Sequence, residues 1–155
     1  MQMSINLQIK QALFQACEKH IQQKIETAQK GMNDVQSAAN NETKSSVGDK
    51  YETGRAMMHL EKNKFAIQLS EALQLKQQLA QIQQDKICIQ VEQGSLIKTN
   101  KGYFFIAVSI GKMILSQQAY FVISLASPIG KVFHHTKKGD NISFRKTTYQ
   151  ILEIV

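Results

Sequence analysis

Apolar and small residues recur at steps of three and four through the first half of the chain, which is the spacing of helices with one buried face. The first series comprises Phe14, Cys17, Ile21, Ile25, Ala28, Met32, Val35 and Ala39, and the second comprises Met58, Phe65, Leu69, Ala72 and Leu79. Each helix would contain about 35 residues and extend about 50 Å. Helices of that length need a partner, so we predict that they pair antiparallel as a coiled-coil hairpin.

The segment between the two series contains turn-forming residues and no apolar series. It reads Asn-Asn-Glu-Thr-Lys-Ser-Ser-Val-Gly over residues 40–48. Such residues favour turns because their side chains bond the nearby backbone or tolerate unusual dihedral angles. We therefore expect the first helix to end near Asn40 and Asn41, the tip of the hairpin to lie near residues 40–52, and the hairpin to occupy residues 1–84.

After Asp85 and Lys86 the apolar period changes from helical to two, with Ile87, Ile89 and Val91 alternating with other side chains. This alternation is typical of strands, and the sequence Gly94-Ser95 marks a turn after it. Further strands are predicted at residues 103–108, 119–125, 141–144 and 149–154, and a short helix capped near Pro128 is predicted within residues 127–135. The fold class is therefore α+β, with a small antiparallel or mixed sheet in residues 85–155.

The formal charge of +7 is unevenly distributed, because residues 1–86 contribute +2 and residues 87–155 contribute +5. A basic surface suits nucleic acid or an acidic protein partner. The cations that we expect to form a basic patch in the C-terminal part are Lys131, Lys137, Lys138, Arg145 and Lys146. The sequence leaves electrostatic steering and a merely solvated surface as alternatives.

Cysteine spacing and hydropathy indicate the compartment. Cys17 and Cys88 form neither a CxxC motif nor a Cys/His ligand spacing, so we expect no zinc site and no disulfide framework. The adjacent His134 and His135 also lack a third ligand. The start of the chain has no basic segment followed by an apolar one, and residues 103–126 are interrupted by Lys112, so we expect a cytoplasmic protein without a membrane contact.

Two carboxylates stand three residues apart at the predicted start of the second helix. Asp49 and Glu52 would project from one face of that helix. Such a pair can hold Mg²⁺, a hard cation that accepts a few carboxylate oxygens and keeps several waters. The same pair also fits a capping box, which stabilises a helix start by about 1 kcal/mol, and the two roles are compatible.

Five short segments together resemble the bacterial Gre transcription elongation factors, and the resemblance covers nearly the whole chain. In the C-terminal part these are residues 94–97 (Gly-Ser-Leu-Ile), 127–131 (Ser-Pro-Ile-Gly-Lys), 138–140 (Lys-Gly-Asp) and 149–154 (Tyr-Gln-Ile-Leu-Glu-Ile). Upstream, residues 48–52 (Gly-Asp-Lys-Tyr-Glu) stand where that family has the acidic tip of its coiled coil.

The resemblance implies an FKBP-like C-terminal domain that docks on RNA polymerase through Ser127, Pro128, Ile129, Gly130 and Lys131. It also implies that the coiled coil enters the secondary channel, where the tip carboxylates act beside the RNA 3′ end and stimulate cleavage of backtracked RNA. On this interpretation the chain is a monomeric accessory factor and not an enzyme, has no cofactor of its own, and shares Mg²⁺ with the polymerase active site.

Departures from the family pattern leave other functions open. Lys50 stands where the family commonly has an apolar residue, and Thr53 replaces an asparagine, which is compatible with a secondary-channel regulator that does not stimulate cleavage. A prolyl isomerase or chaperone is a further alternative, because FKBP-type folds often have that activity, although fold does not imply function. The last alternative is a structural coiled-coil adaptor that has no enzyme as its partner. Met57, Leu60 and Ile67 lie outside the main apolar series and could support self-association.

Overall fold

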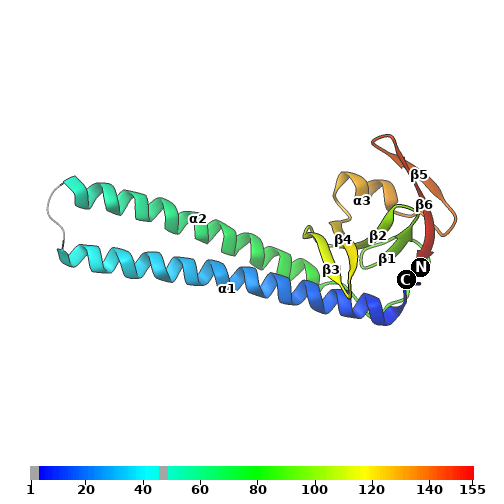
Figure 1. Ribbon diagram of the computed structural model, residues 1–155, viewed down its shortest axis with the longest axis horizontal. Helices are drawn as coiled ribbons and strands as arrows, with labels where there is room; N and C mark the ends of the chain where they lie inside the picture. Colours follow the sequence, from blue (N-terminus) through cyan, green and yellow to red (C-terminus); the bar gives the residue numbers. More distant parts are fainter. Residues whose placement is uncertain (1–3, 46–48) are drawn as a thin grey trace. The chain divides into compact units, whose positions relative to one another are not determined.

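The computed structural model describes residues 4–45 and 49–155, without the side chains of residues 42–45 and 49–51. Two long helices, α1 (Leu7–Ser45) and α2 (Asp49–Ala80), precede six strands and one short helix (Figure 1). These later elements are β1 (Leu96–Thr99), β2 (Gly102–Ala107), β3 (Gly111–Leu115), β4 (Gln118–Ser124), α3 (Pro128–Phe133), β5 (Asn141–Phe144) and β6 (Thr147–Ile154). The fold is therefore α+β.

The chain forms two compact units, and α1 and α2 each contribute to both. The first unit contains residues 1–18 and 77–155, and the second contains residues 19–76. Hence the first turns of α1 belong with the sheet. The predicted domain boundary between residues 84 and 85 stays a prediction.

In the second unit, the paired helices bury the apolar face that the sequence predicts. Ile21, Ile25, Ala28 and Val35 of α1 and Ala72 of α2 are buried, while Met58, Phe65 and Leu69 are half-buried. Gly31 lies against the ring of Phe65, and Lys62 Nζ donates to Gln36 Oε1 at 2.7 Å. From Gly31 to Gln36 the chain moves forward along α1, while the contacted residue of α2 moves back from Phe65 to Lys62. The two helices therefore run antiparallel.

The end of α1 differs from the predicted one. The helix begins at Leu7, where Asn6 caps it with a hydrogen bond from Ile9 N to Asn6 Oδ1 of 2.9 Å. It continues to Ser45, so the predicted end near Asn40 and Asn41 is wrong. Turn-forming residues have only weak conformational preferences, and those up to Ser45 remain helical. Residues 46–48, within the predicted tip, lie outside the described residues.

The six strands form one mixed sheet in the order β3-β4-β2-β1-β6-β5. β2 and β4 are parallel, with Phe104 opposite Phe121, and the other neighbouring pairs are antiparallel. The helix α3 lies in the connection from β4 to β5 and contacts β5. Strands β2, β4, β5 and β6 and the helix α3 match predicted elements.

The strand predicted at Ile87, Ile89 and Val91 is wrong. Ile87 and Ile89 are 67% and 85% exposed, whereas Cys88 and Val91 are buried, so the alternation does not correspond to one buried face. Gln90 forms an isolated bridge with Lys137, and the sheet itself begins at Leu96. The strands β1 and β3 were not predicted.

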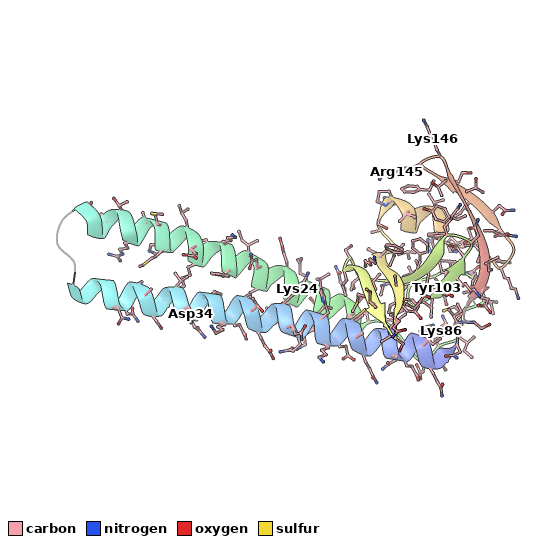
Figure 2. All side chains as sticks on the ribbon, viewed as in Figure 1. Lys24, Asp34, Lys86, Tyr103, Arg145 and Lys146 are labelled. Carbon is pink, nitrogen blue, oxygen red and sulfur yellow. The ribbon has the colours of Figure 1, made fainter. Side chains whose placement is uncertain are left out.

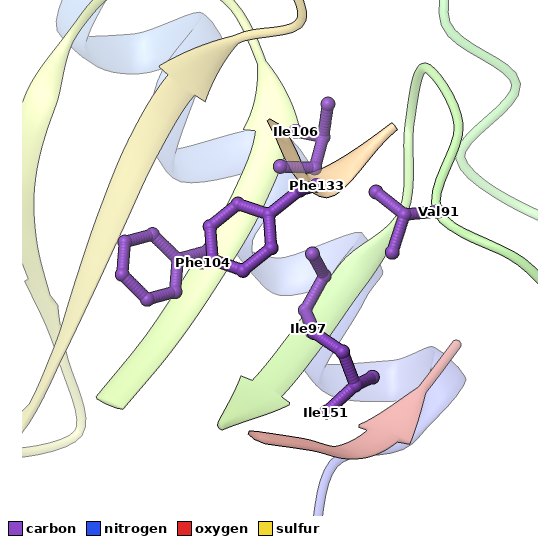
Figure 3. Packing of buried hydrophobic residues seen from close by; sticks show 6 residues of the cluster. All are labelled: Val91, Ile97, Phe104, Ile106, Phe133 and Ile151. Atoms are coloured by element: carbon purple, nitrogen blue, oxygen red, sulfur yellow. The ribbon is translucent and has the colours of Figure 1, made fainter. Parts of the chain in front are cut away.

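Aromatic and branched side chains fill the core next to the sheet (Figure 3). Phe104 of β2 lies 5.1 Å from Phe133 of α3 and 5.9 Å from Tyr149 of β6, measured between ring centroids. The cluster of buried residues is Val91, Ile97, Phe104, Ile106, Phe133 and Ile151. Phe133 is fully buried, so it fixes the position of α3 and of the turn before it.

Candidate functional site

The predicted docking segment forms the start of α3, and Ser127 caps that helix. Ser127 Oγ accepts a hydrogen bond from Gly130 N at 3.1 Å and donates one to Ser124 O at 2.6 Å. Pro128 occupies the first helical turn, where its missing N–H has no intrahelical acceptor. These contacts tie the end of β4 to the start of α3.

Gly130 allows the close approach of β4 and α3. A Cβ atom at this position would collide with Ser124 O and would lie 2.9 Å from both Leu125 O and Ser127 Oγ. Two of these three atoms belong to the backbone and cannot rotate away. Glycine is therefore required here for packing.

The five predicted docking residues differ in their access to a partner. Pro128 and Lys131 are exposed, Ser127 and Ile129 are half-buried, and Gly130 is buried. Ile129 also packs against the core cluster around Phe104 and Phe133. The surface that this turn offers to a partner is thus formed mainly by Pro128 and Lys131, while the other three residues hold its shape.

The predicted acidic pair lies at the start of α2, in the other compact unit. Asp49 is the first residue of α2, and its side chain lies outside the described part of the structure, as does that of Lys50. Glu52 lies in the first helical turn and is exposed, as is Thr53. The backbone therefore has the helical spacing that the prediction needs, and the roles of the two carboxylates stay predictions.

The five predicted patch cations are all exposed. Arg145 and Lys146 form the two-residue turn between β5 and β6, at the end of that hairpin in Figure 2, with φ values of 49° and 66°. Non-glycine residues rarely adopt this conformation. The Arg145 guanidinium lies 4.9 Å from the centroid of the Phe144 ring. The turn therefore presents two cations on a strained hairpin end.

A buried polar group that the sequence pattern did not predict lies in the sheet-containing unit. Lys10 is fully buried, and its Nζ donates to Lys86 O at 2.6 Å and contacts Cys88 Sγ at 3.7 Å. Lys86 Nζ in turn pairs with Glu92 Oε1 at 2.8 Å. Lys10 lies seven residues before Cys17, so the apolar spacing of α1 continues to it. That spacing was the one signal in the sequence that Lys10 is buried.

Burial and hydrogen bonding shift the pKa values in this group. Burial lowers the pKa of Lys10, although the nearby Cys88 and Glu92 oppose that shift. Hydrogen bonds with Lys86 and Cys88 lower the pKa of Glu92, and the partner carboxylate raises the pKa of Lys86. The group thus combines a buried amine, a thiol and a carboxylate.

Other features of interest are a histidine pair and the long helices. The rings of His134 and His135 stack with centroids 3.6 Å apart. Among the residues that the structure describes, no three His, Cys, Asp or Glu side chains gather in an arrangement that could hold a metal ion. Within the same described ranges, no helix has both the length and the apolar character needed to cross a membrane.

Comparisons of this chain with protein-family models, with curated proteins and with solved structures find no match.

Proposed function

We propose that the chain is a cytoplasmic RNA polymerase-binding factor of the Gre type, whose sheet domain has an FKBP-like fold. The sheet domain docks at the rim of the secondary channel, and the paired helices reach inward with Asp49 and Glu52 at their end. There they stimulate cleavage of backtracked RNA by the polymerase, which remains the enzyme. The observation that carries this proposal is the antiparallel pair of very long helices.

The length and surface of that pair favour a reaching role. α1 has 39 residues and α2 has 32, so at 1.5 Å per residue they extend about 60 and 50 Å. The small core of a domain of this size does not need such lengths. Between residues 19 and 76 the buried side chains of α1 follow one face, and α2 contributes the buried Ala72 and the half-buried Met58, Phe65 and Leu69. Most of the exposed side chains are polar, and the large exposed apolar ones on α2 are Met57, Leu60, Ile67 and Leu73. A narrow, solvated rod of this kind suits insertion into a channel.

The start of α3 supports docking by the sheet domain. Ser127 and Gly130 hold this turn through short contacts to the end of β4, so its outer surface is fixed before a partner arrives. A preformed surface loses little conformational entropy on binding. Pro128 and Lys131 are the exposed members of the turn, and Lys131 adds a positive charge suited to an acidic surface.

The proposed chemistry is metal-assisted hydrolysis. A second Mg²⁺ ion in a two-metal site orients the attacking water and stabilises the leaving oxygen. Asp49 and Glu52 would supply carboxylate oxygens to that ion, which the polymerase binds weakly alone. The helical backbone from Asp49 onward gives the three-residue spacing that places both residues on one face.

A second candidate is a regulator of the same fold that occupies the channel without stimulating cleavage. Lys50 follows Asp49 directly, so the first turn of α2 contains a cation between the two carboxylates. A neighbouring positive charge weakens the field that attracts Mg²⁺. This alternative keeps polymerase binding and loses the hydrolytic step.

RNA cleavage in backtracked elongation complexes of the cognate polymerase tests the proposal. We expect shortened transcripts with the wild-type chain, at Mg²⁺ concentrations where the polymerase alone cleaves slowly, and their loss with Asp49→Ala/Glu52→Ala. Glu61→Ala/Glu71→Ala is the matched control, because it removes two exposed carboxylates farther along α2. Binding of the chain to the polymerase without shortening of the transcript would favour the non-cleaving regulator. Failure to bind the polymerase would contradict both candidate functions.

The docking surface needs a separate measurement. Lys131→Glu should weaken polymerase binding, whereas Lys112→Glu, which reverses an exposed charge on β3, should not. Equal binding by both variants would show that the start of α3 is not the contact.

A further inference from the structure

The buried Lys10 amine has three neighbours in the sheet-containing unit. Its Nζ donates to Lys86 O at 2.6 Å and to Val155 O at 3.1 Å, and its third neighbour is Cys88 Sγ at 3.7 Å. Lys10 is fully buried and Cys88 is 4% exposed. An amine and a thiol are therefore held together in a place that excludes most reagents.

The arrangement of these neighbours directs the nitrogen toward the sulfur. A lysine ammonium has three N–H groups in tetrahedral positions. Two are used by the backbone oxygens of Lys86 and Val155, so the third faces Cys88 Sγ. When the ammonium loses this third proton, the lone pair that replaces it points at the sulfur, and the contacts to the two backbone oxygens keep the amine in place.

The groups around Cys88 include a proton acceptor and an amine. Oxidants attack the thiolate form of a cysteine, so the thiol proton must leave before the reaction. Glu92 interacts with Cys88 and is held by Lys86, so a carboxylate is present that can accept a proton. Burial lowers the pKa of Lys10, which favours the neutral amine.

We propose that Lys10 and Cys88 form a redox modification site, in which a peroxide oxidises the Cys88 thiol and the Lys10 amine then closes onto the sulfur as a reversible sulfenamide cross-link. This inference is independent of the proposed transcription function. A small oxidant such as hydrogen peroxide fits the low exposure of the thiol.

The chemistry balances in two steps. First, the Cys88 thiolate attacks one oxygen of hydrogen peroxide, the O–O bond breaks, an S–O bond forms, and the released hydroxide takes the thiol proton as water. Second, the Lys10 lone pair attacks the sulfenic sulfur, an N–S bond forms, the S–O bond breaks, and the hydroxyl group leaves with an amine proton as water. The sum is thiol, amine and one peroxide giving sulfenamide and two waters. An added thiol reverses the link by attacking the sulfur and releasing the amine.

The other cysteine provides a control in the same unit. Cys17 is also buried, but its thiol contacts Met113 Sδ at 3.7 Å, and burial raises its pKa to about 12. Its thiolate is therefore scarce at neutral pH. Peroxide should modify Cys88 faster than Cys17, although both side chains are buried.

Peptide mapping of the full chain after hydrogen peroxide treatment tests the proposal. Trypsin does not cut after a modified lysine, so the cross-link should join an uncut peptide of residues 1–19 to the peptide of residues 87–98. Its mass should be lower by about 2 Da than the sum of the two peptides, apart from oxidation of methionine, and dithiothreitol should separate them. A disulfide between Cys17 and Cys88 would instead leave the bond after Lys10 cleavable.

Lys10→Arg is the matched variant, because arginine keeps the buried cation and its donors while its guanidinium does not condense with a sulfenic acid. We expect dimedone, which traps sulfenic acids, to label Cys88 in this variant several-fold more than in the wild type. Linked peptides in the wild type support the proposal even if the variant does not fold. Absence of linked peptides in the wild type, with Cys88 either unmodified or labelled by dimedone, would overturn it.

Discussion

Replacing Gly130 with alanine tests whether the turn before α3 depends on close backbone packing. The backbone of Gly130 is helical, so alanine can adopt its dihedral angles. Alanine is also the better helix former by about 1 kcal/mol. Local propensity alone therefore predicts that Gly130→Ala stabilises the protein.

The contacts of Gly130 predict the opposite sign. The new Cβ would overlap Ser124 O, and Leu125 O would lie 2.9 Å away. Ser124 O cannot withdraw without loss, because it accepts hydrogen bonds from Ser127 Oγ at 2.6 Å and Ser127 N at 3.0 Å. Two hydrogen bonds contribute about 1 kcal/mol each, and overpacking costs about 1–3 kcal/mol. The lost hydrogen bonds and the overpacking are together larger than the gain in helix propensity, so we expect Gly130→Ala to lower the free energy of unfolding by about 3 kcal/mol.

Urea unfolding followed by tyrosine fluorescence measures this change. The chain has no tryptophan, and three of its four tyrosines, Tyr103, Tyr120 and Tyr149, lie in the sheet-containing unit. With a urea dependence of about 2 kcal/mol/M, the midpoint should fall by about 1.5 M. Gly111→Ala is the comparison for backbone strain alone: its Cβ would meet open space, so its cost comes from the φ of 99° and should be about 1–2 kcal/mol. An unchanged or higher midpoint for Gly130→Ala would refute the packing argument.

Three further changes test other parts of the structure. Ser127→Ala should cost about 1 kcal/mol because the cap to Gly130 N is lost, and Ser127→Asp should restore part of it; equal urea midpoints for both variants would contradict the capping role. Replacing Arg145-Lys146 with Asn-Gly should stabilise the β5–β6 hairpin by about 1 kcal/mol, because those residues tolerate positive φ, and a lower thermal midpoint would refute this. The pKa of Lys10 is lowered in the fold, so above that pKa and up to its ordinary value of 10.5 the unfolded chain binds more protons and stability rises with pH. Unfolding measured across alkaline pH should therefore show the wild type gaining stability relative to Lys10→Met, and parallel curves would contradict a lowered pKa.

The parts of the fold that sequence predicted are those with a regular apolar period. The apolar series of the first helix depends only on the spacing of residues along the chain. The burial of Ile21, Ile25 and Ala28 confirms that this series forms the buried face. β1 was missed because two of its four residues, Lys98 and Thr99, are polar yet buried. Lys98 is accommodated by a distant partner, Glu153 at 3.6 Å, and Thr99 by a hydrogen bond from its Oγ1 to Gly102 O at 2.8 Å.

Other differences arise where burial depends on neighbours that the sequence does not reveal. β3 lies at the edge of the sheet and has no fully buried residue, so it shows no apolar face. Ile87 and Ile89 alternate as in a strand but point to solvent, while Cys88 between them is buried beside Lys10. Both cases require knowledge of tertiary packing, as does the contact between residues 10 and 88.

The candidate docking segment shows why a motif and a binding surface must be tested with different substitutions. The residues that make Ser-Pro-Ile-Gly-Lys distinctive are partly internal, since Ser127 caps α3, Ile129 packs on the core and Gly130 admits β4. A loss of the proposed polymerase binding after changing any of these three could follow from an altered turn alone, whether or not the turn touches a polymerase. Pro128 and Lys131 point outward and have no comparable contact within the core, so substitutions there change the surface and leave its support intact. If Lys131→Glu weakens the proposed polymerase binding and leaves the free energy of unfolding unchanged, the loss comes from the docking surface and not from folding.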